Sequence, residues 1–227
     1  MILGIVKIEY SQNTKSILIF NAILEIGDGF MANKRTRVIS TEEVHLIINT
    51  IRTGFILPSG KKVKPNDKIA SCLFIEYALG MRLSDNVRLK LSDIQYQDGK
   101  YRINYFKEKK TGKERHNVVP NEVYIYLQEY AIRNGIKYHQ RLFDLTPRAV
   151  QNHLQVTCEY LNLPDDIGSH SFRKRYAQDI YDFEGLHDIN MVSEALGHSS
   201  IAISQRYLGV NSPKLEQALQ SRVVLPT

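Results

Sequence analysis

The stretch IQYQDGKYRINYFKEKKTGKERHNVV, residues 94–119, decides the fold prediction. Apolar and polar residues alternate within it, as they do in half-buried strands, whereas the segments on both sides repeat their apolar residues at helical spacing. Asp98-Gly99 is a turn signal, and the basic segment Lys109–Lys113 is a second connection. The alternation therefore predicts three antiparallel strands, at Ile94–Gln97, Tyr101–Phe106 and Arg115–Val119.

Helical spacing surrounds this sheet on both sides. Three start signals stand out because each offers a side-chain oxygen to a backbone N–H: the capping box Ser40-Thr41-Glu42-Glu43, Asn66, and Thr146 followed by Pro147. The expected helices begin at Ser40, run from Asn66 to Gly80, begin again at a cap on Ser84, cover 122–134 and 148–161, and continue as several short helices from Gly168 onward. The predicted fold class is mainly α with a small three-stranded antiparallel sheet.

The composition predicts a folded intracellular domain. The chain has 227 residues, of which 43% are hydrophobic, enough for one well-filled core. Lys and Arg total 30 against 24 for Asp and Glu, a net charge of +6 that favours a polyanionic partner. The two cysteines, Cys72 and Cys158, predict neither a disulfide framework nor a metal site. No apolar run is long enough to cross a bilayer, so we expect a cytoplasmic location.

Three parts of the chain differ in character. Residues 1–39 form a short N-terminal extension with apolar runs and a basic stretch, and its role stays open. Residues 40–209 form the main domain. Residues 210–227 form a tail in which Ser212-Pro213 predicts another helix. That helix either folds back on its own domain or passes to a neighbouring protomer, and we favour the second arrangement.

Four separated segments hold the residue types of phosphate chemistry: ALGMRLSD at 78–85, KKTGK at 109–113, HSFR at 170–173, and LGHSS at 196–200 with Tyr207 beyond it. Two arginines can clamp one phosphate and stabilise the charge that grows in the transition state. His170 and Arg173 are three residues apart, so they share one face of a helix. A tyrosine hydroxyl can attack phosphorus and hold the strand covalently. No carboxylate cluster accompanies these residues, which fits phosphoryl transfer without a metal ion.

Taken singly, each of these residues has a plainer structural explanation, such as a surface ion pair or a solvated helix face. Taken together and in this order, the four segments resemble the catalytic signature of the tyrosine recombinases, the phage integrase family. The resemblance covers about Ser40 to Tyr207. It implies the catalytic-domain fold of that family and site-specific recombination of DNA through a 3′-phosphotyrosine intermediate, without ATP, metal ion or other cofactor.

The resemblance also implies a role for each residue. Arg82 and Arg173 would bind the scissile phosphate, and His198 would donate a hydrogen bond to it. His170 would help to deprotonate Tyr207, the nucleophile. Lys110 would be the acid that protonates the departing 5′ oxygen, and Lys109 and Lys113 compete with it for that role. Asp85 would support Arg82. The expected DNA contacts are Lys109, Lys113, Arg115, Lys174 and Arg175.

The implied partner is double-stranded DNA with specific recombination sites, bound in the nucleoid by a homotetramer that assembles from monomers or dimers. Family members usually carry a helical core-binding domain of about a hundred residues before the catalytic domain. The segment before Ser40 is too short for one, so the chain resembles the compact, catalytic-domain-only recombinases, and an accessory DNA-bending protein would compensate for weaker encirclement of DNA. Two alternatives remain: a DNA-relaxing enzyme like the type IB topoisomerases, and a DNA-binding regulator that keeps the fold without the activity.

Overall fold

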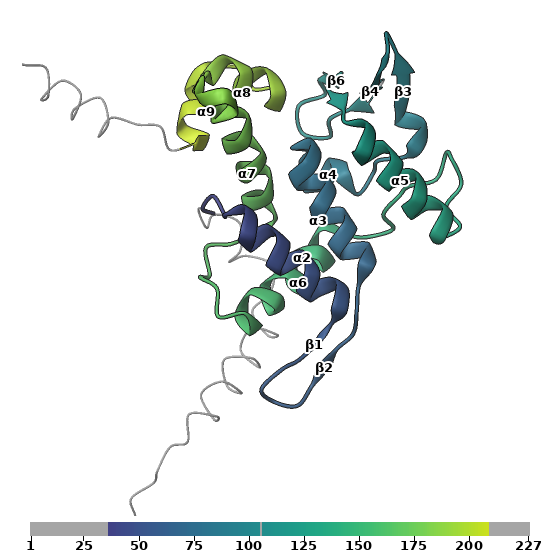
Figure 1. The fold of residues 1–227 in the computed structure, drawn as a ribbon, viewed down its shortest axis with the longest axis vertical. Coiled ribbons are helices and arrows are strands. Elements are labelled where there is room, and N and C mark those ends of the chain that lie inside the picture. The colour runs from purple at the N-terminus through teal and green to yellow at the C-terminus, as the bar shows by residue number, and fades with distance from the viewer. Residues whose placement is uncertain (1–35, 105, 209–227) are drawn as a thin grey trace, which may run out of the picture. The chain divides into compact units, whose positions relative to one another are not determined.

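The computed structural model describes residues 36–104 and 106–208. The predictions for the N-terminal extension and the C-terminal helix therefore lie outside the described residues. Figure 1 shows the elements in chain order: α2 (Thr41–Thr53), β1 (Phe55–Ile56), β2 (Lys62–Val63), α3 (Asp67–Leu79), α4 (Leu83–Asn86), η1 (Leu91–Asp93), β3 (Ile94–Gln97), β4 (Lys100–Ile103), β5 (Phe106–Lys107), β6 (Glu114–Arg115), β7 (Val118–Val119), α5 (Asn121–Arg133), α6 (Pro147–Tyr160), α7 (Ser169–Tyr181), η2 (Phe183–Gly185), α8 (Ile189–Leu196) and α9 (Ile201–Leu208). The mainly helical class with a small antiparallel sheet is confirmed.

Three of the predicted helix starts have the expected caps. The backbone N–H of Glu43 donates to Ser40 Oγ at 3.1 Å, and the Glu43 carboxylate accepts from the Ser40 N–H at 2.8 Å. Asn66 Oδ1 accepts from the third residue of α3 at 3.0 Å, and Thr146 Oγ1 accepts from the third residue of α6 at 3.2 Å. Ser84 is different: it lies inside α4, whose N-cap is Arg82, and no side-chain cap bond is present. The prediction of a Ser84 cap is wrong.

The predicted three-stranded antiparallel sheet is present as β3-β4-β7, with Tyr96 opposite Tyr101 and Tyr101 opposite Val119. The second and third predicted strands are each divided in two, because part of each forms a separate hairpin, β5–β6. The chain leaves the sheet where Asn104 N–H donates to the Asp93 carbonyl at 2.9 Å. On the returning strand, the Asn117 side chain donates to the carbonyl of a residue in α8 at 2.7 Å.

A second hairpin was not predicted. The segment between α2 and α3 reads as a loop in the sequence, but Phe55 pairs with Val63 and Ile56 with Lys62 in β1–β2. A turn closes this hairpin with a hydrogen bond from Gly60 N–H to the Leu57 carbonyl at 2.8 Å. Strands of two residues leave too little alternation for a sequence pattern to reveal.

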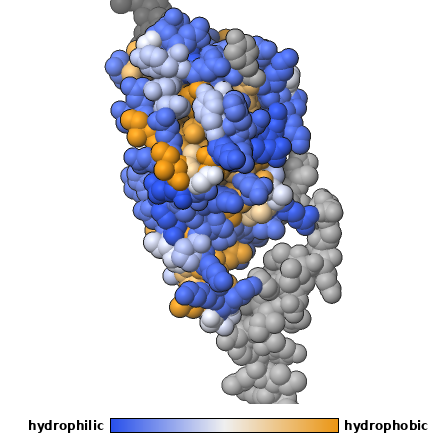
Figure 2. All heavy atoms as spheres, turned by 90° about the vertical axis from the view of Figure 1, so that its right-hand side faces the viewer, coloured by the Kyte–Doolittle hydropathy of each residue, from blue (hydrophilic) through white to orange (hydrophobic). Residues whose placement is uncertain are grey.

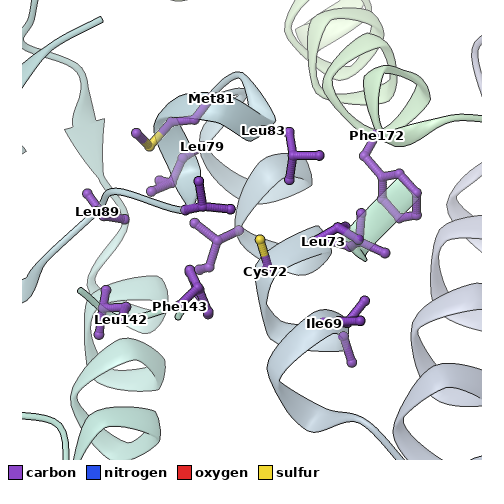
Figure 3. Close-up of a cluster of buried hydrophobic side chains, with 14 of the residues drawn as sticks. Ile69, Cys72, Leu73, Leu79, Met81, Leu83, Leu89, Leu142, Phe143 and Phe172 are labelled. Carbon is purple, nitrogen blue, oxygen red and sulfur yellow. The ribbon is translucent and has the colours of Figure 1, made fainter. Parts of the chain in front are cut away.

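Helix α3 lies at the centre of the main core. Five consecutive residues, 69–73, are buried, so the helix is covered on every side rather than on one face. Figure 3 shows Ile69 and Leu73 on the side of Phe172 in α7, while Leu142 and Phe143 lie on the opposite side. One charged side chain, Glu76, is also fully buried on this helix. Because α3 is held from all sides, the turn that follows it is fixed as well.

A second, smaller core joins α7, α8 and α9. Its fully buried members are Ala177, Val192 and Leu196, with half-buried Tyr207 among the residues packed against them. In Figure 1, α8 and α9 lie together at one end of α7. The last described helix is therefore attached to the main core through α7.

One face of the described part is drawn in Figure 2, where hydrophilic residues cover most of the surface and apolar areas are small and separated. Within residues 36–104 and 106–208, no helix has the length and apolar character needed to span a bilayer.

Candidate active site

The first arginine follows directly from the end of α3. Gly80 closes this helix in the left-handed conformation, with φ of +56°, and Arg82 comes two residues later at the start of α4. A Cβ atom at Gly80 would lie 2.2 Å from a ring carbon of Tyr176 in α7. Glycine is thus required both by the backbone angle and by the close approach of the two helices.

Arg173 is a buried cation held by the ends of two helices. Only 1% of the residue is exposed. Its guanidinium donates to the Gly80 carbonyl, at the C-terminus of α3, and to the Leu196 carbonyl, at the C-terminus of α8, the latter at 3.0 Å. Helix C-termini carry partial negative charge, which compensates a buried cation. Nε of Arg173 is also buried and has no hydrogen-bond partner among the described residues. The bonds of the other two guanidinium nitrogens fix its orientation.

Tyr207 lies between the two predicted histidines. Its ring centroid is 5.1 Å from that of His170 and 5.4 Å from that of His198, both in edge-to-face arrangements. The hydroxyl is buried and makes no hydrogen bond of good geometry within the described residues. The Arg173 guanidinium is nevertheless close enough to favour the phenolate form of Tyr207. His170 and Arg173 lie in α7, His198 lies in the α8–α9 connection, and Tyr207 lies in α9. The fold brings these separate segments together.

His198 has a fixed partner in Ser204, one helical turn before Tyr207. Its Nδ1 lies 2.8 Å from Ser204 Oγ, and Ser204 is fully buried. When the hydroxyl donates to Nδ1, the proton of the neutral imidazole is on Nε2, which leaves Nε2 as a hydrogen-bond donor. This bond also ties the turn after α8 to the helix that carries Tyr207.

The protonation states follow from burial and from the surrounding cations. Loss of hydration, followed by the charges of Arg173, Lys174, Arg82 and Lys110, lowers the pKa of His170 to about 4. Loss of hydration and then the charge of Arg173 lower the pKa of His198 to about 4 as well.

Burial raises the pKa of Tyr207, and the nearby Arg173 only partly offsets this. At neutral pH the free protein therefore has two neutral imidazoles beside a protonated phenol. His170 can accept the phenolic proton in that state.

Arg82 is paired with a carboxylate that the sequence reasoning did not single out. Its guanidinium bonds Glu108, whose side chain is only 4% exposed. Glu108 is the first residue of the loop that joins β5 to β6, and the same carboxylate oxygen accepts a hydrogen bond from Thr111 Oγ1 at 2.8 Å. The sequence signal that could have identified it is an acid immediately before the lysine run. Ser204 was missed too, and its spacing of three residues before Tyr207 is the corresponding signal.

Asp85 was expected to support Arg82, but the structure places it differently. Its Oδ1 accepts a hydrogen bond from the Lys109 backbone N–H at 2.7 Å and lies 3.6 Å from the Arg88 guanidinium. The carboxylate next to Arg82 is Glu108. Asp85 therefore anchors the lysine loop rather than the arginine.

The three lysines of the loop are exposed, and each has a different position. Lys110 is close enough to the site for its charge to act on the His170 pKa. Lys113 Nζ donates to the Gly197 carbonyl at 3.4 Å, and Lys109 is tied down through its backbone. The assignment of Lys110 as the acid stays a prediction.

The predicted DNA contacts beyond the loop are only partly accessible. Lys174 is buried, bonds the Thr36 carbonyl and lies 5.7 Å from the centroid of the Tyr207 ring. Arg175 pairs with Asp179 one turn away on α7, with an Nε–Oδ1 distance of 2.8 Å. Arg115 lies in β6. Their role in DNA binding stays a prediction.

Comparison with known proteins identifies the family of the chain. The phage integrase family matches residues 37–213. The chain belongs to the phage integrase family. Among curated relatives, tyrosine recombinase XerD of Rickettsia prowazekii is 25% identical over 219 residues, which cover 88% of this chain and 67% of the relative. Tyrosine recombinase XerC of Thermodesulfovibrio yellowstonii is 27% identical over 205 residues, covering 81% and 65%. The chain thus spans about two thirds of such relatives.

Solved structures show the same fold. The XerH site-specific recombinase bound to a palindromic difH substrate, in a post-cleavage complex, superimposes with a TM-score of 0.60 at 22% identity, covering 86% of this chain and 55% of that one. The catalytic domain of bacteriophage HP1 integrase gives a TM-score of 0.55 at 21% identity, covering 83% and 96%. The described fold is therefore that of a tyrosine recombinase catalytic domain.

Proposed function

We propose that this chain cuts and rejoins DNA at specific sites, with Tyr207 as the nucleophile. The observation that carries the proposal is the convergence of His170, Arg173, His198 and Tyr207, with the buried Tyr207 hydroxyl close enough to the Arg173 guanidinium for its charge to favour the phenolate. Membership of the phage integrase family supports the same reaction. The relatives named as recombinases and the DNA-bound XerH structure support double-stranded DNA as the substrate.

The proposed step conserves atoms and charge. The Tyr207 oxygen forms a bond to phosphorus while the bond to the 5′ oxygen breaks, and His170 takes the phenolic proton. Arg82, Arg173 and His198 hold the non-bridging oxygens, and their donors stabilise the added charge. Lys110 gives a proton to the departing 5′ oxygen. The strand remains as a 3′-phosphotyrosine until a 5′ hydroxyl of another strand reverses the step.

The expected assembly is a homotetramer on two DNA sites in the nucleoid, formed from monomers or dimers. The C-terminal residues, which the sequence predicts as a helix, are the segment we expect to pass between protomers. An accessory DNA-bending protein is a further proposed partner. Each of these is a proposal that follows from the recombinase assignment.

The decisive experiment traps the covalent intermediate. Genomic DNA of the native host, nicked at random, contains the natural site. A nick just downstream of the scissile phosphate lets the short fragment that bears the released 5′ hydroxyl diffuse away. Wild-type protein is incubated with this DNA in EDTA, denatured, and analysed for protein-linked DNA that can be sequenced. We expect adducts at a small number of positions, and we expect them in EDTA because the arginines supply the positive charge that a metal ion would otherwise supply.

Two variants complete the test. Tyr207→Phe removes the nucleophile and should give no adduct. Tyr181→Phe is the matched control, because Tyr181 packs against the same small core, and it should cleave as wild type. Absence of a wild-type adduct, or an adduct that persists in Tyr207→Phe, would contradict the proposal. Adducts at every sequence, with relaxation of supercoiled DNA, would instead favour the topoisomerase alternative.

A further inference from the structure

Glu108 connects two parts of the site that the chain keeps 26 residues apart. It follows β5 directly and stands two residues before Lys110. One oxygen of its buried carboxylate, Oε2, bonds both the Arg82 guanidinium and the Thr111 hydroxyl. The arginine of the turn after α3 and the residue next to Lys110 are therefore joined through a single atom.

Asp85 anchors the loop that carries Lys110 at the Lys109 backbone, and the Glu108 side chain is a further attachment. Strands β5 and β6 have two residues each, and a ladder this short does not hold a loop in place alone. Within the loop, Gly112 N–H donates to the Glu108 carbonyl, and Glu108 N–H donates to the Lys113 carbonyl, both at 2.9 Å. These bonds shape the loop but do not attach it to the arginine. The Glu108 side chain does.

The charge of Glu108 also acts inside the site. It raises the pKa of Arg173 and of His198, in each case against the larger effect of burial. A carboxylate removed from water is costly unless cations and hydrogen bonds compensate it, and Arg82 and Thr111 supply both. Arg82 and Thr111 therefore fix the position of the Glu108 carboxylate, and the carboxylate in turn fixes the positions of these two side chains.

We propose that Glu108 is a positioning residue for Lys110: through Arg82 and Thr111 it holds the loop so that the lysine ammonium reaches the 5′ oxygen of the phosphate bound by Arg82. The inference rests on the proposed function. In the cleavage step, the proton leaves Lys110 Nζ for the 5′ oxygen as the phosphorus–oxygen bond breaks. Glu108 touches neither the substrate nor the proton and acts through the geometry of the loop.

The test compares two leaving groups at the cleavage site recovered by the adduct experiment. One nicked duplex carries the ordinary 5′-bridging oxygen, and the other carries sulfur at that position. A thiolate departs without protonation because thiols are far more acidic than alcohols. Loss of general-acid help therefore slows cleavage of the oxygen duplex, by on the order of 10²-fold or more, and spares the sulfur duplex. Single-turnover rates are measured at saturating protein.

Three variants give the expected pattern. Lys110→Ala defines the pattern: its cleavage rate falls strongly on the oxygen duplex and recovers on the sulfur duplex. Glu108→Ala should show the same pattern in weaker form, with a loss on oxygen of about 10-fold or more and a sulfur rate within about 3-fold of wild type. Thr111→Val, which leaves the Glu108–Arg82 pair intact, should lose rate on oxygen alone. Glu108→Gln keeps an acceptor oxygen and should recover most of the oxygen rate.

Glu114→Ala is the matched control. Glu114 lies on β6 of the same hairpin and is exposed, and its carboxylate lies 3.9 Å from Lys107 Nζ and 3.6 Å from His116 Nε2. Both of its rates should equal those of wild type. Equal losses of Glu108→Ala on the two duplexes, or no loss at all, would overturn the inference while leaving the recombinase proposal intact. Failure of the wild type to cleave either duplex would overturn the recombinase proposal itself.

Discussion

At the scale of single residues, the site combines cations with two histidines that remain neutral. His170 and His198 have pKa values lowered to about 4, because burial and the nearby arginines disfavour the imidazolium form. A bound DNA phosphate brings negative charge to the same cations. It should therefore offset their effect on both imidazoles.

This reasoning predicts a measurable change on DNA binding. The pKa values of His170 and His198 should rise by about one to three units, because a nearby anion favours the protonated form. Imidazole NMR titrations of the free protein and of the Tyr207→Phe complex with a cognate duplex provide the measurement. His153, whose pKa is lowered by burial alone on α6, is the internal control and should not move. Unchanged values at His170 and His198 would argue against a phosphate between them.

At the scale of elements, the packing of α3 against α7 positions both arginines. Gly80 has a left-handed backbone and faces the Tyr176 ring, while its carbonyl receives Arg173. We predict that Gly80→Ala lowers the free energy of unfolding by about 2 kcal/mol or more, from the strained backbone together with the clash. Urea unfolding followed by circular dichroism provides the measurement.

Gly135 separates the two causes. It has a similar φ of +64°, but a Cβ atom there would meet no atom within 4 Å. Gly135→Ala should therefore lose only about 1 kcal/mol, the cost of the backbone conformation. Equal losses in the two variants would show that the approach of Tyr176 is not restrictive. A larger loss at Gly80 should be accompanied by slower DNA cleavage, because the clash displaces the residue-80 carbonyl that Arg173 binds.

The same scale shows what could be predicted from sequence. The caps at Ser40, Asn66 and Thr146 were predictable because their hydrogen bonds join residues three apart, within reach of a sequence motif. The hairpin β5–β6 was not separated from the main sheet, because the bonds that divide the strands involve Asn104 and Asn117 with distant partners. Local signals specify helices, whereas strand limits depend on tertiary neighbours.

The residues of the site also fall into those that a local sequence motif reveals and those that only tertiary contacts reveal. The motif residues were identified from the sequence, and the fold brings Arg173, both histidines and Tyr207 together. Glu108 and Ser204 were not identified, since their role depends on contacts with Arg82 and His198 that only the folded chain reveals. Asp85 was assigned to the wrong neighbour for the same reason: the sequence shows its distance from Arg82 but not the backbone of Lys109.

At the scale of the whole molecule, the net charge of +6 predicts binding that depends strongly on salt. Each phosphate that a cation neutralises contributes about 0.9 to the slope of log affinity against log salt concentration. Arg82→Ala should therefore reduce this slope by about 0.9, measured by fluorescence anisotropy with the cognate duplex. Arg133→Ala, an exposed residue on α5, is the control and should leave the slope unchanged. A slope near zero in the wild type would contradict a phosphate-binding surface.

The small core beneath α8 and α9 has a consequence for the order of events in catalysis. Among the residues that the structure describes, three members of this cluster, Ala177, Val192 and Leu196, are fully buried, compared with the long apolar core around α3. Elements with little buried surface open at a lower free energy than the rest of a domain. We therefore expect amide hydrogens of α8 and α9 to exchange through local opening while α3 exchanges only on global unfolding. Because the Leu196 carbonyl at the end of α8 binds Arg173, such an opening would also release this arginine, so that Tyr207 and Arg173 would return to their catalytic positions together.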